Sequence, residues 1–473
     1  MKFTFSIFLS LGCLYFALGF SQFVFADVSR DCKPGGSVEQ RLACIDGLTF
    51  KEVTSEASPT GFRVFSIMFK QPVDHDAPNG ETFNQKLVLF HRSYSAPMIL
   101  QTSGYQIFGT ALTNVARKFN GNQIQVEHRF FGDSVPASLD WQKLDIRQSA
   151  ADFHRIVQAF KPQYGGKWLN TGASKGGMTS IFHKRFYPDD LDGTLALVAP
   201  LSYSTADERY VSFVENVGGE TYKTCRAALE TFQRVALSRK SEILSRIRGA
   251  YSILGSLEIG FEHAVFETPF AFWQYGNPNS SVTGCSKVPG PNATGAELFS
   301  FMESVNSVER SYSDEGMKPF VSYYAQASHQ LGSPAAKLSH IADVAGFEDT
   351  YRIETYIPQE ASRGFDESVM PEIQHWVETE AEKVMFIYGE FDPWTAGAYR
   401  GGSADRDNYM FTAPGANHGA NIETLTASDR TQAWNVIKNW LNVREVTDFA
   451  LFQDSAKSLE QIEFEALKGR GRL

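Results

Sequence analysis

A short glycine-rich segment carries the side chain best suited to nucleophilic chemistry. Residues 172–176 read Gly-Ala-Ser-Lys-Gly, directly after an apolar run and directly before a segment that can form a helix. In the pattern Gly-x-Ser-x-Gly the serine lies on a strained turn between a strand and a helix, and the glycines let neighbouring backbone pass close to it. The segment therefore predicts a nucleophilic serine at Ser174, with an ordinary glycine-rich loop as the alternative.

Two downstream segments supply an acid and a histidine in a defined order. Residues 382–389 predict a buried strand that ends in a turn carrying Asp392, and residues 409–413 predict a short strand followed by a loop carrying His418. An open α/β sheet places its reactive residues beyond the carboxyl ends of its strands. Hydrolases with a serine elbow have the chain order serine, acid, histidine. We therefore expect Ser174, Asp392 and His418 to form a catalytic triad.

The segments ahead of the serine indicate the sheet that must position it. Residues 86–92, 97–102 and 122–127 are compact apolar or alternating runs bounded by turn residues, which is typical of strands. Residues 145–160 carry apolar side chains at helical spacing and lead into the strand before Ser174. Strands that alternate with helices in this way predict an α/β fold with a doubly wound, mostly parallel sheet, as in α/β-hydrolases.

The turn after residues 97–102 is suited to stabilise a developing oxyanion. In this fold one backbone N–H comes from the residue after the nucleophile, and another comes from the loop after an earlier strand. Here these groups belong to Lys175 and to Tyr105, which follows Gly104 in that turn. We expect the two N–H groups to form the oxyanion hole. A packed loop aromatic is the alternative for Tyr105.

Several further blocks of sequence resemble a known family. The blocks are residues 127–132 (Glu-His-Arg-Phe-Phe-Gly), 171–178, 185–188 with 192–193, 388–394 and 413–421. Together they are similar to the secreted bacterial prolyl tri/tetrapeptidyl aminopeptidases, over roughly residues 60–440. A more distant resemblance exists to the lysosomal Pro-X carboxypeptidases and dipeptidyl peptidase II, which share the Glu-His-Arg and Asp-Pro-Trp signatures.

The resemblance implies an α/β-hydrolase core, a triad of Ser174, Asp392 and His418, and cleavage after proline near a free N-terminus. The expected protein is thus a secreted serine exopeptidase that releases tri- or tetrapeptides through an acyl-enzyme. A Pro-X carboxypeptidase or dipeptidyl peptidase, an esterase or lipase on the same scaffold, and a noncatalytic binding protein are the alternatives.

Substrate recognition requires a slot for proline and a carboxylate for the α-ammonium. Trp394, beside the acid, is the first candidate for the slot, and a core tryptophan is the alternative. Glu127, Asp207 and Glu208 are candidates for the carboxylate. A salt bridge with a nearby arginine is the alternative for each of them.

The sequence patterns divide the chain into five expected segments. Residues 1–26 are expected to be a signal peptide, and residues 27–204 and 378–445 the two parts of the hydrolase core. Residues 205–377 are expected to form a mostly helical cap, inserted before the catalytic acid, that admits only chain ends. A packing domain with no role in selection is the alternative. Residues 446–473 form a tail outside the family resemblance, although residues 449–467 have the near-helical spacing typical of a docked terminal helix.

The N-terminus favours export from the cytoplasm. Lys2 precedes a long apolar run that ends in Val-Phe-Ala at residues 24–26, which is typical of a cleaved signal peptide. A secreted or periplasmic protein is expected, with a retained membrane anchor as the alternative.

Cysteine usage agrees with export. After cleavage four cysteines remain, and an even number in an exported protein favours disulfides. Proximity in sequence suggests Cys32–Cys44 and Cys225–Cys285 among three possible connectivities, with free buried thiols as the alternative.

Charge and motifs argue against several partners. The formal net charge of −10 argues against nucleic acid and anionic membranes. The sequence contains no Cys-x-x-Cys and no His-Glu-x-x-His motif, so neither a metal nor another cofactor is expected. The expected partners are peptides with proline near the N-terminus.

Overall fold

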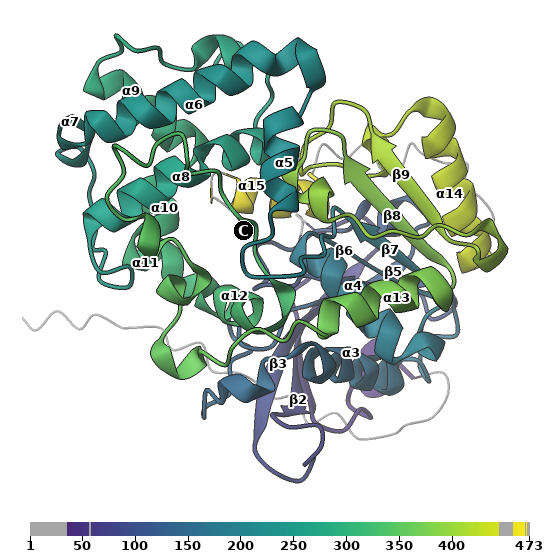
Figure 1. The fold of residues 1–473 in the computed structure, drawn as a ribbon. Helices are drawn as coiled ribbons and strands as arrows, with labels where there is room; N and C mark the ends of the chain where they lie inside the picture. Colours follow the sequence, from purple (N-terminus) through teal and green to yellow (C-terminus); the bar gives the residue numbers. More distant parts are fainter. Residues whose placement is uncertain (1–35, 56–57, 444–456, 469, 471–473) are drawn as a thin grey trace, which may run out of the picture. The chain divides into compact units, whose positions relative to one another are not determined.

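The computed structural model describes residues 36–55, 58–443, 457–468 and 470. The predicted signal peptide therefore lies outside the described residues. The chain divides into two compact units, residues 1–46 and 47–473. In the first unit, helix α1 (Val38–Leu42) is closed by a capping box in which Ser37 and Gln40 bond each other's backbone. Every element described below belongs to the second unit (Figure 1).

A nine-stranded sheet organises the second unit, in the order β1-β2-β3-β5-β4-β6-β7-β8-β9. The strands are β1 (Leu48–Glu52), β2 (Arg63–Pro72), β3 (Thr82–His91), β4 (Met98–Thr102), β5 (Asn122–Val126), β6 (Trp168–Ala173), β7 (Gly193–Leu197), β8 (Val384–Gly389) and β9 (Tyr409–Ala413). From β5 to β9 all neighbours pair in parallel, whereas β1, β2 and β3 are antiparallel to their neighbours. The predicted mostly parallel sheet of an α/β-hydrolase is therefore confirmed.

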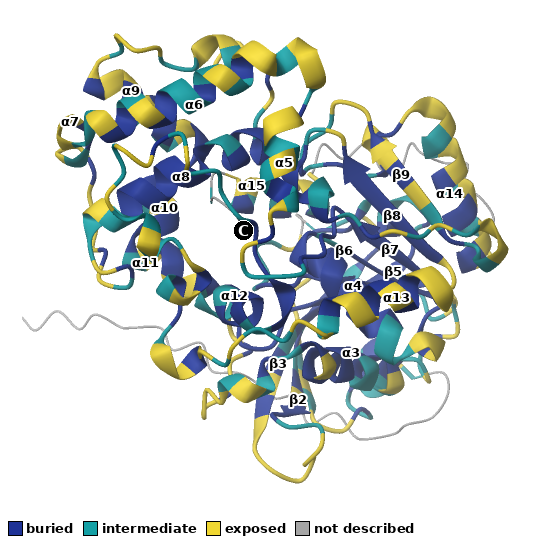
Figure 2. Cartoon of the chain, in the orientation of Figure 1, coloured by how far each residue is buried: buried dark blue, intermediate teal, exposed yellow. Residues whose placement is uncertain are grey.

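Burial explains why the central strands are apolar. Every residue of β4, β5, β7 and β8 is buried, because helices cover both faces of a parallel sheet (Figure 2). Neighbouring side chains on β8 point to opposite sides, so Met385 and Phe386 enter different hydrophobic clusters. The sheet thus has a separate packed core on each face.

Helices on the two faces come from different parts of the chain. They are α2 (Asn114–Lys118), α3 (Ile146–Phe160), α4 (Lys175–Phe186), α13 (Val369–Thr379) and α14 (Ala427–Leu441). Ile146 of α3, Ile181 of α4 and Ile373 of α13 share one cluster, whereas Val115 of α2 and Ile437 of α14 share the other. The predicted helix at residues 145–160 is confirmed, and the Asp145 side chain caps it by accepting from the Gln148 N–H.

Between β7 and β8 the chain forms a helical segment with its own hydrophobic cluster. Its helices are α5 (Arg209–Asn216), α6 (Lys223–Ser238), α7 (Lys240–Leu244), α8 (Leu257–Tyr275), α9 (Gly295–Val305), α10 (Val308–Tyr312), α11 (Asp314–Met317) and α12 (Val321–Gln326). A disulfide joins Cys225 of α6 to Cys285, as predicted. The other predicted pair includes Cys32, which lies outside the described residues. The expected boundary at residue 377 falls inside α13, which packs against α4 on the sheet.

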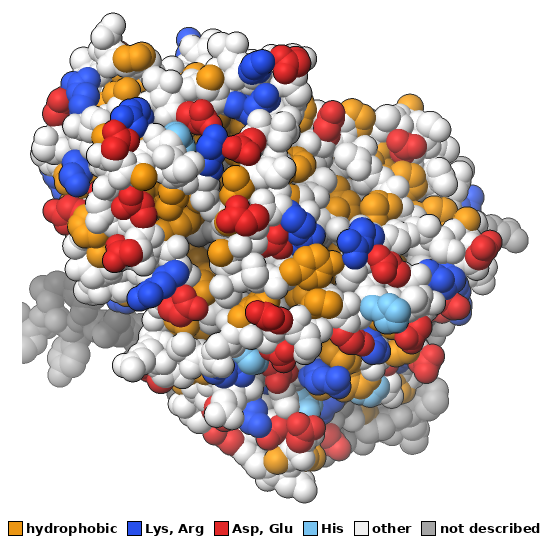
Figure 3. All heavy atoms as spheres, in the orientation of Figure 1, with side chains coloured by type: hydrophobic (Ala, Val, Ile, Leu, Met, Phe, Trp, Pro, Cys, Tyr) orange, Lys and Arg blue, Asp and Glu red, His pale blue; other side chains and the backbone are white. Residues whose placement is uncertain are grey.

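The surface in view carries charges of both signs. Acidic and basic side chains are interspersed on the face drawn in Figure 3, an arrangement typical of a surface exposed to water. None of the described helices is long and apolar enough to cross a membrane.

A buried ion pair joins the antiparallel strands to the helical layer. The Arg129 guanidinium is fully buried and donates from Nε and Nη2 to the Asp152 carboxylate of α3, at 2.6 and 2.7 Å. Its Nη1 also donates to the carbonyls of Val73 and Lys143, at 2.9 and 2.8 Å. Burial raises the pKa of Asp152, but the charge and hydrogen bonds of Arg129, together with those of His75 at 2.7 Å, outweigh it and hold that pKa below its usual value. The Glu-His-Arg block therefore has a structural function through its arginine.

Replacing this arginine is expected to destabilise the whole second unit. In Arg129→Met the buried Asp152 carboxylate keeps His75 at 2.7 Å but loses both guanidinium contacts, so the free energy of unfolding should fall by about 3–5 kcal/mol. Urea unfolding followed by tryptophan fluorescence measures the change. Arg400→Met is the control, because Arg400 pairs with Glu378 on the surface and such a pair contributes about 0–1 kcal/mol. Equal losses in the two variants would show that the buried pair has no special role.

Candidate active site

The serine elbow has the geometry that its sequence predicts. Ser174 lies between β6 and α4 with φ 54° and ψ −126°, a strained conformation for a residue with a side chain. A Cβ on Gly176 would lie 2.2 Å from the Thr102 carbonyl oxygen, and one on Gly172 would lie 2.5 Å from the same atom. Both glycines are therefore required by the close approach of β4 to the elbow.

The acid and the histidine meet in the structure. Nδ1 of His418 lies 2.7 Å from Oδ2 of Asp392, and both side chains are buried. Oδ1 of Asp392 accepts from the Trp394 N–H at 3.1 Å, because Asp392 caps the short 3-10 helix Pro393–Gly397. The Asp-Pro-Trp order thus orients the carboxylate from one side while the histidine binds it from the other. The backbone N–H of His418 donates to the Gln274 carbonyl of α8 at 2.9 Å, which fixes the loop that carries His418.

The loop after β4 packs directly on the elbow. Gly104 has φ 74°, and a Cβ there would lie 2.5 Å from the Gly176 nitrogen. The Lys175 ammonium is buried and donates to the Gly104 carbonyl at 2.6 Å. It also lies over the rings of Tyr105 and Phe131, 5.7 and 5.0 Å from their centres. Burial lowers the pKa of Lys175 well below its usual value. The residues expected to form the oxyanion hole, Lys175 and Tyr105, are therefore held against each other.

Glu127 bonds the loop after β4 through its carboxylate. Its carboxylate accepts from the Ile107 N–H at 3.1 Å, the Asp133 N–H at 2.7 Å and the Ser134 hydroxyl at 2.9 Å. Burial raises its pKa, which these hydrogen bonds partly offset. Glu127 is absent from the walls of both described cavities that contain Ser174. Glu127 thus joins two loops, and its contact with substrate stays a prediction.

The other two candidate carboxylates, Asp207 and Glu208, lie at the start of the helical segment. Asp207 pairs with Arg209 at 2.7 Å and accepts from the Tyr203 N–H at 2.9 Å. For Asp207 the structure therefore contains the alternative to substrate binding, a salt bridge with a nearby arginine. Glu208 is exposed at the start of α5. None of the three residues lines a described cavity that contains Ser174.

Two small cavities adjoin Ser174. The first, of about 30 Å³, is also lined by His418 and by Tyr105, Phe108 and Tyr275. The second, of about 10 Å³, is lined by aromatic and apolar side chains that include Trp394, Tyr323, Met178 and Leu331. Ser174 therefore faces both an aromatic cavity beside the histidine and a narrower slot on its other side.

Trp394 closes the narrower slot. Its ring is buried and meets Tyr210 and Phe270 edge-to-face, with ring centres 5.5 and 5.3 Å apart. The same ring lies 6.3 Å from that of His418. Trp394 thus links the helical segment to the site while it lines the slot.

A helix near the C-terminus forms the remaining wall of the first cavity. Helix α15 (Leu459–Leu467) contributes Glu460, Glu463, Phe464 and Leu467 to that wall. The spacing over residues 449–467 indicated a docked helix, and Ser458 and Gln461 form its capping box. Residues 449–456 lie outside the described residues. The sequence contained no signal for contact with the serine, because that contact depends on where the helix docks.

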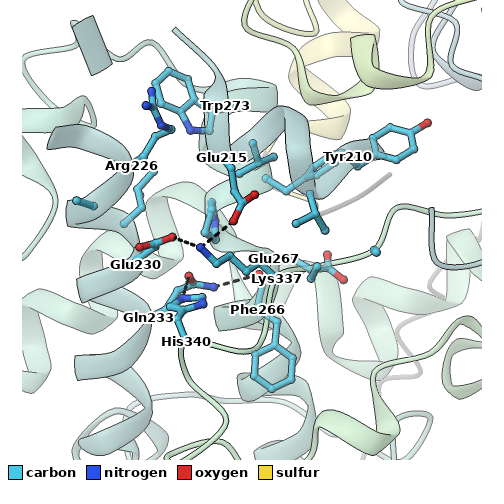
Figure 4. Close-up of a pocket in the computed structure, with 18 of the residues that line it drawn as sticks. Tyr210, Glu215, Arg226, Glu230, Gln233, Phe266, Glu267, Trp273, Lys337 and His340 are labelled. Atoms are coloured by element: carbon cyan, nitrogen blue, oxygen red, sulfur yellow. Dashed lines mark hydrogen bonds and ion pairs between the residues drawn. The ribbon is translucent and has the colours of Figure 1, made fainter. Parts of the chain in front are cut away.

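A larger cavity lies inside the helical segment (Figure 4). It measures about 310 Å³, and in it Lys337 lies between Glu215 and Glu230, at 2.8 and 2.9 Å. Tyr210 and Phe270 line it and pack on Trp394, so these three rings stand between it and the serine.

The chain matches one protein family and is similar to several known proteins. The family described as PS-10 peptidase S37 matches residues 33–459. The prolyl tri/tetrapeptidyl aminopeptidase of Streptomyces mobaraensis is 36% identical over 429 residues, which cover 88% of this chain and 88% of that protein. The human lysosomal Pro-X carboxypeptidase is 22% identical over 452 residues, which cover 81% of this chain and 90% of that protein. A solved structure of proline iminopeptidase from Mycobacterium smegmatis is similar over 79% of this chain and 97% of that chain, with 15% identity and a TM-score of 0.34.

A methyl group at the elbow is expected to impair the serine. In Gly176→Ala the new Cβ meets the Thr102 carbonyl, so the elbow must shift. The free energy of unfolding should fall by about 1–3 kcal/mol, and labelling of Ser174 by a fluorophosphonate should slow about 100-fold. The control is Gly165→Ala, where a Cβ would meet nothing within 4 Å. Unchanged labelling in Gly176→Ala would show that the elbow tolerates the shift.

Proposed function

The chain belongs to the PS-10 peptidase S37 family, a family of serine peptidases, and from this premise we propose that it is a secreted or periplasmic exopeptidase that cleaves after proline. It would release tri- or tetrapeptides from a free N-terminus. The mode of cleavage is supported by the Streptomyces mobaraensis relative and by the blocks of sequence around Glu127 and Asp392. Export is supported by the sequence of residues 1–26 alone.

The observation that carries the proposal is the buried pair of His418 and Asp392 beside an elbow serine. The pair is 2.7 Å apart, and His418 lines one cavity with Ser174. In the proposed mechanism His418 takes the proton from the Ser174 hydroxyl as it attacks the scissile carbonyl. Asp392 holds the imidazole in the required tautomer and stabilises the imidazolium.

The tetrahedral intermediate needs donors for its oxyanion. We assign these to the backbone N–H groups of Lys175 and Tyr105, and each such donor is worth about 3 kcal/mol. The Lys175 side chain would keep the loop in register through its bond to the Gly104 carbonyl. His418 then protonates the leaving amine, and water hydrolyses the acyl-enzyme.

Selection of proline is assigned to the narrow slot beside Ser174. Trp394 and Tyr323 give this slot aromatic walls that suit a pyrrolidine ring, and Met178 and Leu331 add apolar surface. The slot measures about 10 Å³, so it would have to widen to admit the ring. The helical segment, expected at residues 205–377, would act as a cap that excludes folded protein and admits chain ends.

A carboxypeptidase is the nearest alternative, because the human relative has that activity in its name. Such an enzyme needs a cation for the terminal carboxylate of its substrate. The described charged side chains on the wall of the cavity shared by Ser174 and His418 are Glu460 and Glu463. Neither side chain is a cation, so this wall supplies no positive charge for a terminal carboxylate, which favours the aminopeptidase mode. Lys175 lines the second cavity beside Ser174 but donates to the Gly104 carbonyl.

The proposed function predicts a defined substrate profile. Ala-Ala-Pro-p-nitroanilide with a free N-terminus should be hydrolysed, whereas its N-acetylated twin should be a poor substrate. Ser174→Ala should abolish turnover, and Asp392→Asn should lower kcat about 10⁴-fold because the histidine tautomer is lost. Steady-state kinetics with active-site titration measure both effects. Hydrolysis of p-nitrophenyl butyrate with neither peptide cleaved would identify an esterase instead.

The proposed slot predicts a loss of selectivity when its wall is removed. In Trp394→Ala the preference for proline over alanine before the scissile bond, expressed as a ratio of kcat/KM, should fall about 10- to 100-fold. Trp434→Ala is the control, because Trp434 packs on Phe119 at the opposite face of the sheet. An unchanged ratio in Trp394→Ala would place the proline slot elsewhere.

A further inference from the structure

Helix α15 places two carboxylates on the wall of the cavity that Ser174 and His418 share. Glu460 and Glu463 stand one turn apart on this helix, and both line the cavity. The residues matched by the family end at 459, which is the first residue of α15. These carboxylates therefore belong to a part of the chain that the family resemblance does not cover.

Contacts on three sides fix the helix in this position. The Leu459 N–H donates to the Leu112 carbonyl at 3.1 Å, and the Asn114 N–H donates to the Glu460 carboxylate at 2.9 Å. The ring of Phe464 packs edge-to-face on Tyr275 of α8, with centres 5.5 Å apart. The helix thus bridges the loop after β4 and the helical segment.

Glu463 is buried with little to compensate its charge. Its side chain is 8% exposed, and Oε1 accepts from the Gln101 amide at 2.8 Å. Burial, and then the neighbouring Glu460, raises the pKa of Glu463 to about 8. No basic side chain of the described residues forms an ion pair with it. A buried carboxylate in this state favours any ligand that brings a positive charge.

One basic side chain, Arg117, acts on the charge of Glu460. The charge of Arg117 lowers the pKa of Glu460, although burial raises that pKa overall. The Arg117 guanidinium donates to the Lys457 carbonyl at 2.7 Å. Arg117 is not among the described residues that line the cavity.

The remaining cavity wall suits the body of a peptide. Phe464, Tyr275 and Phe108 supply apolar surface. Within the described part of the chain, Nε2 of His418 is buried and has no hydrogen-bond partner. The cavity thus combines an acidic end, apolar walls and the nitrogen that acts as the base in the proposed mechanism.

We propose that Glu463 binds the α-ammonium of the substrate's free N-terminus, with Glu460 as a second carboxylate beside it. This inference rests on the proposed function. The three carboxylates expected from the sequence line neither described cavity that contains Ser174, whereas these two line one of them. Because the cavity measures only about 30 Å³, a bound peptide must displace the Phe464 and Leu467 side chains that line it.

The test compares free and blocked peptides in a charge-removing variant. Glu463→Gln keeps the size of the side chain and removes its charge. KM for Ala-Ala-Pro-p-nitroanilide should rise about 10- to 100-fold, which is the worth of a charged hydrogen bond, with kcat nearly unchanged. KM for the N-acetylated peptide should not change. Glu465→Gln on the same helix is the matched control, because Glu465 is exposed and pairs with Lys457.

A binding measurement separates this inference from the chemistry of the site. In Ser174→Ala, the product Ala-Ala-Pro should bind more tightly than N-acetyl-Ala-Ala-Pro by isothermal titration calorimetry, and adding Glu463→Gln should remove the difference. Thermal unfolding and fluorophosphonate labelling of the single variants verify the fold and the serine. If Glu463→Gln hydrolyses and binds the free peptide like the wild type, Glu463 does not bind the ammonium, and the proposed function still stands. If the wild type hydrolyses only an ester, the proposed function fails and the inference fails with it.

Discussion

The close approach of three backbone segments at the serine elbow is the constraint on which the site depends. Strand β4 passes so near to the start of α4 that Gly104, Gly172 and Gly176 leave no space for a Cβ. The Thr102 hydroxyl lies 2.7 Å from the Gly176 carbonyl oxygen, and Lys175 reaches back to the Gly104 carbonyl. These contacts join the end of β4 and the loop after it to the start of α4, so they fix that loop against the serine. A hydrolase needs such rigidity, since its oxyanion donors must be in place before the charge develops.

Buried charge is treated differently in the scaffold and in the site. In the scaffold, the Arg129 guanidinium donates to the Asp152 carboxylate and also to the carbonyls of Val73 and Lys143. Near the serine, Lys175 donates to a carbonyl and lies over aromatic rings, and Glu463 has an amide as its partner. Paired charges stabilise a single arrangement, whereas incompletely compensated ones leave binding energy available for a ligand. Lys175 and Glu463 therefore differ from the Arg129–Asp152 pair in how far their charge is compensated.

The site is assembled from segments that lie far apart in the chain. The loop after β4, the elbow, the turn after β8 and the loop after β9 meet at the carboxyl ends of parallel strands, where this type of sheet gathers its reactive groups. The helical segment adds Tyr275 and Tyr323, and the C-terminal helix adds Glu463 and Phe464. Each addition narrows the space around the serine, which is consistent with a site that receives the end of an extended chain.

The sequence alone determined the features that depend on local backbone preference and on chain order. The elbow, the strand at residues 98–102, the helix at residues 146–160 and the turn at Asp392 follow from glycine placement, apolar periodicity and capping, all of which act within a few residues. Strands β1, β2 and β7 went unrecognised, since pairing with neighbours rather than a clear local pattern defines them. Tertiary structure alone decided what Glu127 contacts and where α15 docks. The hydrogen bond between Gln101 and Glu463 spans 362 residues. Such a contact is set by the packing of whole elements, and no local pattern encodes it.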